Sequence, residues 1–396
     1  MKLLVLNSGS SSLRFKFYES KGWKRLFSGH IDGIGLKNCR LRGDIETKVK
    51  AKNHTQALKI ALAILQESGH LTHPKEIEAV GHRVVHGGEK YHNPIRITRT
   101  VLKDLKKLSD LAPLHNPPNI QGVTACQKLL KKATNVAIFD TGFHATLPEH
   151  AYLYGLPYEL YRKHGIRKYG FHGTSHKYVA EQTISLLKKS KKKYSKIITC
   201  HIGNGVSLTA IKNGKSLDTT MGFTPLEGVM MGTRTGDFDS AVIFYLHDHL
   251  KMKLSDIDHL VNKKSGLLGL SGISSDMRPL WKILQNKKSK QYAAVKRAYD
   301  AYVYRLAKKI ASLTVPLGGL DALVFTAGIG ESAWYLRRDI CKQLTHLGLN
   351  LDPTKNKKTI EGKSGLINKP RTTSVVVMPT NEELKIAKET VVALQK

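Results

Sequence analysis

Two stretches of the chain, half a chain apart, share one pattern of apolar and polar positions. LLVLNSGSSSLRFKF begins at Leu3, and IITCHIGNGVSLTAI begins at Ile197. In each stretch an apolar run enters a turn of small residues and a second apolar run follows. The first run predicts a buried strand, and the alternation of Leu13, Phe15 and Phe17 predicts its hairpin partner. Such a recurrence indicates a duplicated domain.

The rest of the chain alternates short apolar runs with segments of helical spacing. Strands are predicted at residues 3–7, 79–86, 136–140, 197–203, 323–327 and 375–379. Helical spacing of apolar residues predicts helices around 58–65 and 295–310. This mixture predicts an α/β fold. Because 396 residues exceed what one core supports, we expect two domains, with a ligand-binding cleft between them.

The composition of the chain limits the classes of protein to which it can belong. The longest apolar runs fall short of the ~18 residues of a membrane span, and the first strand reaches Asn7 too early for a signal peptide. The four cysteines are far apart, which favours neither a zinc site nor a disulfide framework. We therefore expect a soluble, cytoplasmic protein.

The chain is strongly basic, with 64 Lys and Arg against 31 Asp and Glu, a net charge of +33. Its lysine clusters, such as KKSKKKYSK from Lys188, could bind nucleic acid, steer anionic substrates or form solvated surface. The clusters lack the interleaved aromatic residues of a single-strand binding surface. Solvated surface is therefore the favoured interpretation, with steering of anions as a secondary benefit.

The turns of the two predicted hairpins suit an anion. Small residues let backbone N–H groups approach a ligand, and the hydroxyls of Ser10 and Ser12 add donors. Phosphate is the anion that this geometry fits best. A plain hairpin turn is the alternative for either copy alone.

Charged residues stand at the ends of two predicted strands. Arg83, in GHRVVHGGEK, could hold a carboxylate through both arms of its guanidinium, and a structural salt bridge is the alternative. Asp140 ends the strand of VAIFDTGFH, where it could orient a nucleophile or hold a metal. A helix cap is the alternative for Asp140.

Two glycine-rich segments carry further candidates. His172 and His176 have the spacing of a zinc-binding pair, but no glutamate lies between them and Gly173 disfavours a helix there. Arg234, on a flexible loop, is suited to contact a transferring phosphoryl group.

The C-terminal third adds a glycine pair and a carboxylate pair. Gly328 and Gly330 follow a predicted strand without a full dinucleotide or Walker motif, which favours a nucleotide base or ribose packed on this turn. Glu382 and Glu383 could hold Mg²⁺ through water, or could be acids at a helix N-terminus. Together the candidates predict phosphoryl transfer, which requires positioning, a cation and donors.

Ten motifs, in order, carry a family resemblance: NSGSSSLRF, GHRVVHGGE, LAPLHNPPN, FDTGFH, YGFHGTSH, CHIGNG, MGFTPLEGVMMGTRTGD, SGLLGLSGISSDMR, FTAGIGE and PTNEEL. From Met1 to about Lys388 the chain resembles the acetate kinases. The resemblance implies two duplicated ribonuclease-H-like domains of the actin and sugar-kinase type around a central cleft. Residues 1–145 plus 380–396 would form a carboxylate and Mg²⁺ domain with a returning C-terminal helix, and 146–379 the nucleotide-binding domain. A homodimer is also implied.

The resemblance also implies roles for individual residues. Asp140, His172 and Arg234 would be catalytic, and Asn7 and Glu382 would hold Mg²⁺, with Mn²⁺ as an alternative. Acetate would be bound by Arg83, Val85, Leu114, Phe171 and Pro225. ATP or ADP would be bound by Ser10, Ser12, Arg14, His201, Ile202, Gly203, Asn204, Gly205, Asp276, Met277, Arg278, Gly328, Ile329, Gly330, Glu331 and Ser332. The implied reaction is reversible in-line transfer of the ATP γ-phosphate to acetate, within acetyl-CoA biosynthesis and without membrane or nucleic-acid partners.

Four positions depart from the family pattern. Arg14 stands where the family has lysine, and Ser332 where it has asparagine. Gly142 stands in place of alanine, and Ser240 in place of proline. These changes bear on nucleotide affinity more than on activity. The alternatives are a propionate or butyrate kinase of the same family, a regulatory ATPase of the superfamily, and a basic nucleic-acid-binding protein with a vestigial kinase site.

Overall fold

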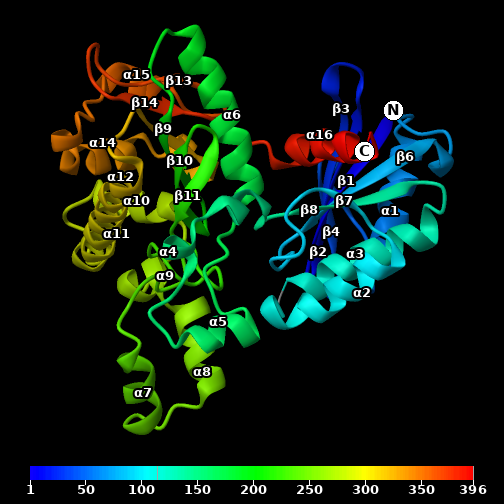
Figure 1. The fold of residues 1–396 in the computed structure, drawn as a ribbon, viewed down its shortest axis with the longest axis horizontal. Coiled ribbons are helices and arrows are strands. Elements are labelled where there is room, and N and C mark those ends of the chain that lie inside the picture. Colours follow the sequence, from blue (N-terminus) through cyan, green and yellow to red (C-terminus); the bar gives the residue numbers. More distant parts are fainter. Residues whose placement is uncertain (114, 396) are drawn as a thin grey trace. The chain divides into compact units, whose positions relative to one another are not determined.

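The computed structural model describes residues 1–113 and 115–395. The chain divides into two compact units, Met1–Ala145 with Asn381–Lys396, and Thr146–Thr380. Each unit is built on its own β-sheet (Figure 1). No helix among the described residues has both the length and the apolar character needed to span a bilayer.

The first unit has a sheet in the order β5-β4-β3-β2-β1-β6-β8-β7. Its strands are β1 (Lys2–Gly9), β2 (Ser12–Glu19), β3 (Lys24–Asp32), β4 (Arg40–Gly43), β5 (Thr47–Lys48), β6 (Ile77–Val84), β7 (Ile95–Arg96) and β8 (Thr134–Phe139). β1 pairs antiparallel with β2 and parallel with β6, which in turn is parallel to β8. The three parallel strands therefore end at one edge of the sheet.

Both faces of β1 are covered, which explains its continuous apolar run. Leu4 and Leu6 belong to a core shared with α1 (His54–Glu67) and α3 (Asn116–Leu129). Leu3 and Val5, on the other face, pack with residues of α16 (Glu382–Leu394). α2 (Arg99–Lys107) completes the helices of this unit. Figure 1 shows α16, the last helix, against the strands that begin the chain.

The second unit repeats the central strand arrangement of the first. Its sheet, in the order β11-β10-β9-β12-β14-β13, comprises β9 (Lys196–Ile202), β10 (Val206–Lys212), β11 (Lys215–Thr219), β12 (Ala322–Thr326), β13 (Gly365–Leu366) and β14 (Ser374–Val377). β9 is antiparallel to β10 and parallel to β12, which is parallel to β14. The predicted duplicated α/β fold is thus confirmed, and the two hairpins are equivalent elements.

Helices of the second unit cover and extend this sheet. They are α4 (Glu149–Tyr152), α5 (Tyr158–His164), α6 (Gly173–Lys189), α7 (Ala241–Asp248), α8 (Leu254–His259), α9 (Gly266–Ser271), α10 (Met277–Leu284), α11 (Tyr292–Ser312), α12 (Thr314–Leu317), α13 (Ala327–Ser332), α14 (Trp334–Gln343) and α15 (Pro353–Lys358).

Three local predictions were wrong. β6 ends at Val84 and β14 ends at Val377, so the strands predicted to residues 86 and 379 are each two residues too long. The segment around Gly328 and Gly330 is not a turn but the helix α13. The Arg337 guanidinium donates hydrogen bonds to the carbonyl oxygens of Gly330 and Glu331, at 2.9 and 2.6 Å. This tertiary contact holds the last turn of a helix that glycine disfavours.

Candidate active site

Arg83 and Asp140 meet at the carboxyl edge of the first sheet. Arg83 pairs in register with Ile138 across β6 and β8, and Asp140 directly follows β8. The Arg83 Nη2 donates a hydrogen bond of 2.8 Å to the Asp140 Oδ2. The Asp140 side chain is 1% exposed and that of Arg83 18% exposed. The two predicted site residues therefore form one ion pair at the strand ends.

The N-terminus of α16 adds two carboxylates to this pair. The Arg83 Nε lies 3.9 Å from the Glu382 Oε2, and the Lys16 Nζ lies 2.8 Å from the Glu383 Oε2. Burial, with added repulsion from Asp140 and Glu383, raises the pKa of Glu382 to about 7 despite Arg83. Although burial alone would raise the pKa of Glu383, Lys16 lowers it. Negative charge therefore accumulates around Glu382.

The first hairpin lies close to the same cluster. Asn7 pairs in register with Arg14, and Ser10 and Ser12 lie at the turn. The charge of Arg14 acts on the pKa of Glu382, which places the hairpin within electrostatic reach of α16. Among the described residues, no group of three or more His, Cys, Asp or Glu side chains is arranged to hold a metal. A metal here would need asparagine, water or ligand oxygens as well.

Histidines of the second unit gather around Ser207. The His172 Nδ1 and the His176 Nε2 are hydrogen-bonded to the Ser207 Oγ, at 2.8 and 2.7 Å. The His172 ring stacks on that of His201, with centroids 4.1 Å apart. His172 has a φ of 56° just before α6. A hydroxyl, rather than a metal, therefore joins the histidine pair noted in the sequence.

Arg234 lies against the turn of the second hairpin. A Cβ added to Gly205 would lie 3.3 Å from the His172 Cε1 and 3.6 Å from the Arg234 Nη1. The Arg234 Nη1 donates to the Pro225 carbonyl at 3.4 Å and approaches the Met231 sulfur at 3.7 Å. Burial lowers the pKa of Arg234. The fold thus brings Arg234, His172 and Pro225 together beside a turn where a side chain at Gly205 would fit tightly.

A cavity of about 790 Å³ is lined by half of the residues predicted to hold the nucleotide. We call it the α10–α13 cavity. Its predicted lining residues are Gly203, Asn204, Asp276, Met277, Arg278, Gly328, Ile329 and Ser332, and the structure adds Ser275, Trp281, Ala333 and Tyr335. A large concave pocket of this kind is the usual form of a small-molecule site.

Five other residues of the second unit that were predicted to hold the nucleotide do not line this cavity. They are His201, Ile202, Gly205, Gly330 and Glu331. The Glu331 Oε1 accepts a hydrogen bond of 3.1 Å from the Thr380 N–H, and burial raises the pKa of Glu331. Glu331 therefore has a structural partner beside α13.

Two of the predicted acetate residues, Val85 and Phe171, are buried, each within its own unit. Val85 is 4% exposed, and its N–H donates to the Asn119 Oδ1 at 3.0 Å. Phe171 is 2% exposed. Leu114 lies outside the described residues.

The sequence profile of the Acetokinase family matches residues 2–388. The chain belongs to the acetokinase family. An acetate kinase of Thermotoga maritima is 46% identical over 405 residues, which cover 100% of this chain and 99% of that protein.

Two solved structures have the same fold as this acetokinase. An acetate kinase of Porphyromonas gingivalis has a TM-score of 0.91 at 41% identity, with 99% of each chain covered. A propionate kinase of Francisella tularensis also has a TM-score of 0.91, at 40% identity, with 99% of each chain covered. Overall fold therefore does not separate the two carboxylate substrates.

Sequence reasoning missed two aromatic residues in the α10–α13 cavity of this acetokinase. Trp281 and Tyr335 stack with ring centroids 3.7 Å apart and an interplanar angle of 2°. Trp281 lies one helical turn after Met277, a predicted site residue. That spacing is the signal that could have identified Trp281.

Proposed function

We propose that this protein is an acetate kinase that transfers the γ-phosphoryl group of ATP to acetate, reversibly. An acetate oxygen forms a bond to the γ-phosphorus while the bond from that phosphorus to the β–γ bridging oxygen breaks. The products are acetyl phosphate and ADP, and no proton is transferred. The observation that carries the proposal is the buried Arg83–Asp140 pair beside Glu382, in a chain of the acetokinase family.

Each charged residue has a role in this proposal. Arg83 and Arg234 bind the acetate carboxylate, because a guanidinium can donate two hydrogen bonds to it. Arg234 and His172 stabilise the phosphoryl group in transfer, where charge spreads over its oxygens. Asp140 orients Arg83 and the reacting groups. The acetate methyl group is assigned to Val85, Leu114, Phe171 and Pro225.

Mg²⁺ is assigned to Asn7 and Glu382, with Mn²⁺ as a substitute. Both residues offer oxygen ligands, which Mg²⁺ prefers alongside substrate phosphates. Burial, together with Asp140 and Glu383, raises the pKa of Glu382, and a divalent cation would balance the negative charge of this cluster. When bound, the ion would neutralise charge on the ATP phosphates.

ATP is assigned to both hairpins and to the α10–α13 cavity. Ser10, Ser12, Arg14 and the turn from His201 to Gly205 would contact the phosphates. The adenosine would occupy the cavity, where the stacked rings of Trp281 and Tyr335 offer an aromatic wall. Asp276 and Arg278 lie at its rim and bind each other at 2.6 Å.

The oligomeric state and the cellular compartment of the protein are also part of the proposed function. We propose a homodimer in the cytoplasm that contributes to acetyl-CoA biosynthesis. The exposed apolar side chains of α7, with Phe244 66% and Tyr245 56% exposed, support burial against a second copy. Sedimentation of the purified protein would measure the assembly directly.

Trapping the acyl phosphate with hydroxylamine tests the proposed activity. With MgATP, we expect hydroxamate from acetate, a smaller rate from propionate and a still smaller rate from butyrate. ATP hydrolysis without hydroxamate would indicate an ATPase instead. A higher kcat/KM for propionate than for acetate would assign the protein as a propionate kinase.

A further inference from the structure

A second cavity lies between α14 and α15, with a volume of about 400 Å³. We call it the α14–α15 cavity. Trp334, Arg338 and Lys342 line it from one face of α14, at spacings of four residues, and Thr345 lines it from the 3-10 turn that follows. Lys357 of α15 and Asn350 complete the polar lining. None of these residues has a role in the proposed transfer reaction.

The α14–α15 cavity is rich in positive charge. Arg338, Lys342 and Lys357 line it, and its described lining contains no Asp or Glu. The Arg338 Nε does pair with the Asp339 Oδ1 at 2.7 Å. That contact compensates one of the three cations, and the charges of the two lysines remain for a ligand.

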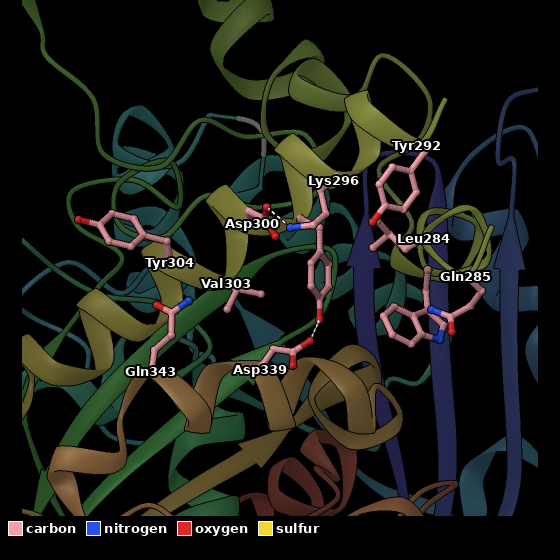
Figure 2. Close-up of a pocket in the computed structure, with 11 residues that line it drawn as sticks. Leu284, Gln285, Tyr292, Lys296, Asp300, Val303, Tyr304, Asp339 and Gln343 are labelled. Atoms are coloured by element: carbon pink, nitrogen blue, oxygen red, sulfur yellow. Dashed lines mark hydrogen bonds and ion pairs between the residues drawn. The ribbon is translucent and has the colours of Figure 1, made fainter. Parts of the chain in front are cut away.

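The neighbouring cavity between α10, α11 and α14, about 490 Å³ in volume, is a useful contrast (Figure 2). There the Lys296 ammonium pairs with Asp300, and the Tyr299 hydroxyl donates to the Asp339 Oδ2 at 2.8 Å. Figure 2 shows both interactions as dashed lines. The charged groups of this cavity have partners within its wall. The cavity therefore gives no indication of a charged ligand.

The indole of Trp334 holds two cations in place at the α14–α15 cavity. The Lys357 Nζ lies 4.8 Å and the Arg338 Cζ 5.4 Å from the ring centroid. Cation–π contacts of this kind restrict flexible side chains before a ligand arrives. The cavity therefore presents partly ordered cations beside the amide of Asn350 and the hydroxyl of Thr345.

We propose that the α14–α15 cavity is a second anion site, which binds a small phosphorylated organic molecule. A phosphate group offers several acceptor oxygens with up to two negative charges, which matches the two lysine ammonium groups. The volume admits a sugar phosphate, with the apolar remainder of the wall against its carbon skeleton.

A continuous set of contacts joins this site to the α10–α13 cavity. Asn356 lines the α14–α15 cavity, and its Oδ1 accepts a 2.8 Å hydrogen bond from the buried Arg337 Nε. Arg337 in turn donates to the carbonyl oxygens of Gly330 and Glu331 in α13. The Asn356 Nδ2 donates to the Trp334 carbonyl at 2.9 Å. We infer that an anion bound beside Trp334 alters nucleotide affinity through Arg337.

Calorimetric titration with ribose 5-phosphate, and with ribose as the neutral control, tests the anion site. We expect the wild type to bind ribose 5-phosphate but not ribose. The double variant Lys342→Gln and Lys357→Gln should bind it at least tenfold more weakly. The matched double variant Lys355→Gln and Lys358→Gln removes the same charge without touching the cavity lining and should bind like wild type.

Two outcomes would overturn the anion site: no binding by the wild type, or equal binding by both double variants. Melting temperatures within a few degrees of wild type would show that each variant is folded. This measurement does not involve acetate or phosphoryl transfer, so it stands apart from the proposed function.

The coupling rests on the proposed assignment of ADP to the α10–α13 cavity, and it has its own test. Saturating ribose 5-phosphate should change the ADP dissociation constant about fivefold in the wild type. The change should vanish in the Lys342→Gln and Lys357→Gln variant. An unchanged ADP affinity would refute the coupling, whereas failure of the wild type to bind ADP at all would refute the nucleotide assignment instead.

Discussion

Arg83 in the first unit lies against two carboxylates, whereas Arg234 in the second is held by a carbonyl oxygen and a thioether. Although burial opposes it, Asp140 and Glu382 raise the pKa of Arg83 above its usual value. Burial lowers the pKa of Arg234, and within the described residues no ion pair compensates the charge of its guanidinium. A buried cation without an anion is costly, and a bound anion removes that cost.

The difference teaches how the two units divide the chemistry. The first unit concentrates carboxylates, which suit a metal ion and hold a guanidinium in one orientation. The second concentrates a cation and neutral donors, which suit phosphate oxygens. Two copies of one strand arrangement thus carry opposite electrostatic environments.

Breaking the Arg83–Asp140 pair should have the largest effect. In Asp140→Asn the charge partner of Arg83 is lost at nearly constant shape, and we expect kcat to fall by about 10³-fold. Hydroxamate formation from acetate measures the loss. Asp110→Asn, at an exposed carboxylate of the same unit, is the control and should keep wild-type activity. Near-normal turnover by Asp140→Asn would remove Asp140 from the site.

Acid should lower the folding stability of the first unit, because the buried His82 must then take up a proton. Burial lowers the pKa of His82 to about 4, despite a 2.7 Å hydrogen bond with Asn135. Because the unfolded chain binds the proton more readily, stability is full above pH 6.5 and falls as the pH drops from 6.5 to 4. At about 1.4 kcal/mol for each unit of pKa, the loss from His82 is about 3 kcal/mol.

Urea unfolding at pH 7 and pH 4 would measure this loss. The variant His82→Gln, which cannot become charged, should show a smaller difference between the two pH values than the wild type. Equal differences in the two proteins would mean that His82 does not contribute.

Replacing the guanidinium of Arg234 by an ammonium group should have the next largest effect on activity. Arg234→Lys keeps the charge but loses the planar fork, and we expect kcat to fall by about 10²-fold. Arg297→Lys, on an exposed face of α11, is the control. A merely raised KM for acetate, with kcat unchanged, would limit Arg234 to substrate binding.

Enlarging the proposed methyl pocket should have the smallest effect. Val85→Ala removes two methyl groups, and we expect kcat/KM for propionate relative to acetate to rise by about tenfold. Val101→Ala removes the same groups from a buried position in α2 and should leave the ratio unchanged. An unaltered ratio in Val85→Ala would reject the pocket assignment.

Local sequence predicted the elements that depend on neighbouring residues. The hairpins at Leu3 and Ile197 follow from apolar runs and small turn residues, and both were confirmed. The approach of Arg83 to Asp140 follows from the common edge at which parallel strands end.

Contacts between distant segments escaped sequence reasoning. Trp281 and Tyr335 come from different helices, and periodicity within each helix does not report their stacking. The same holds for the helix α13, which depends on hydrogen bonds from Arg337 in the next helix. Ser207 likewise became visible as the partner of two histidines only once β10 and α6 were placed together.

The position of α16 has a consequence for synthesis of the chain. Domains usually fold from the N-terminus as the ribosome releases them. Here Leu3 and Val5 lie on a face of the first sheet that is covered by α16. This face therefore stays exposed until α16 has been translated. The same helix carries Glu382, so the carboxylate cluster is complete only after α16 has been synthesised. A nascent chain without α16 would therefore leave one face of the first sheet uncovered and would lack Glu382, a proposed Mg²⁺ ligand.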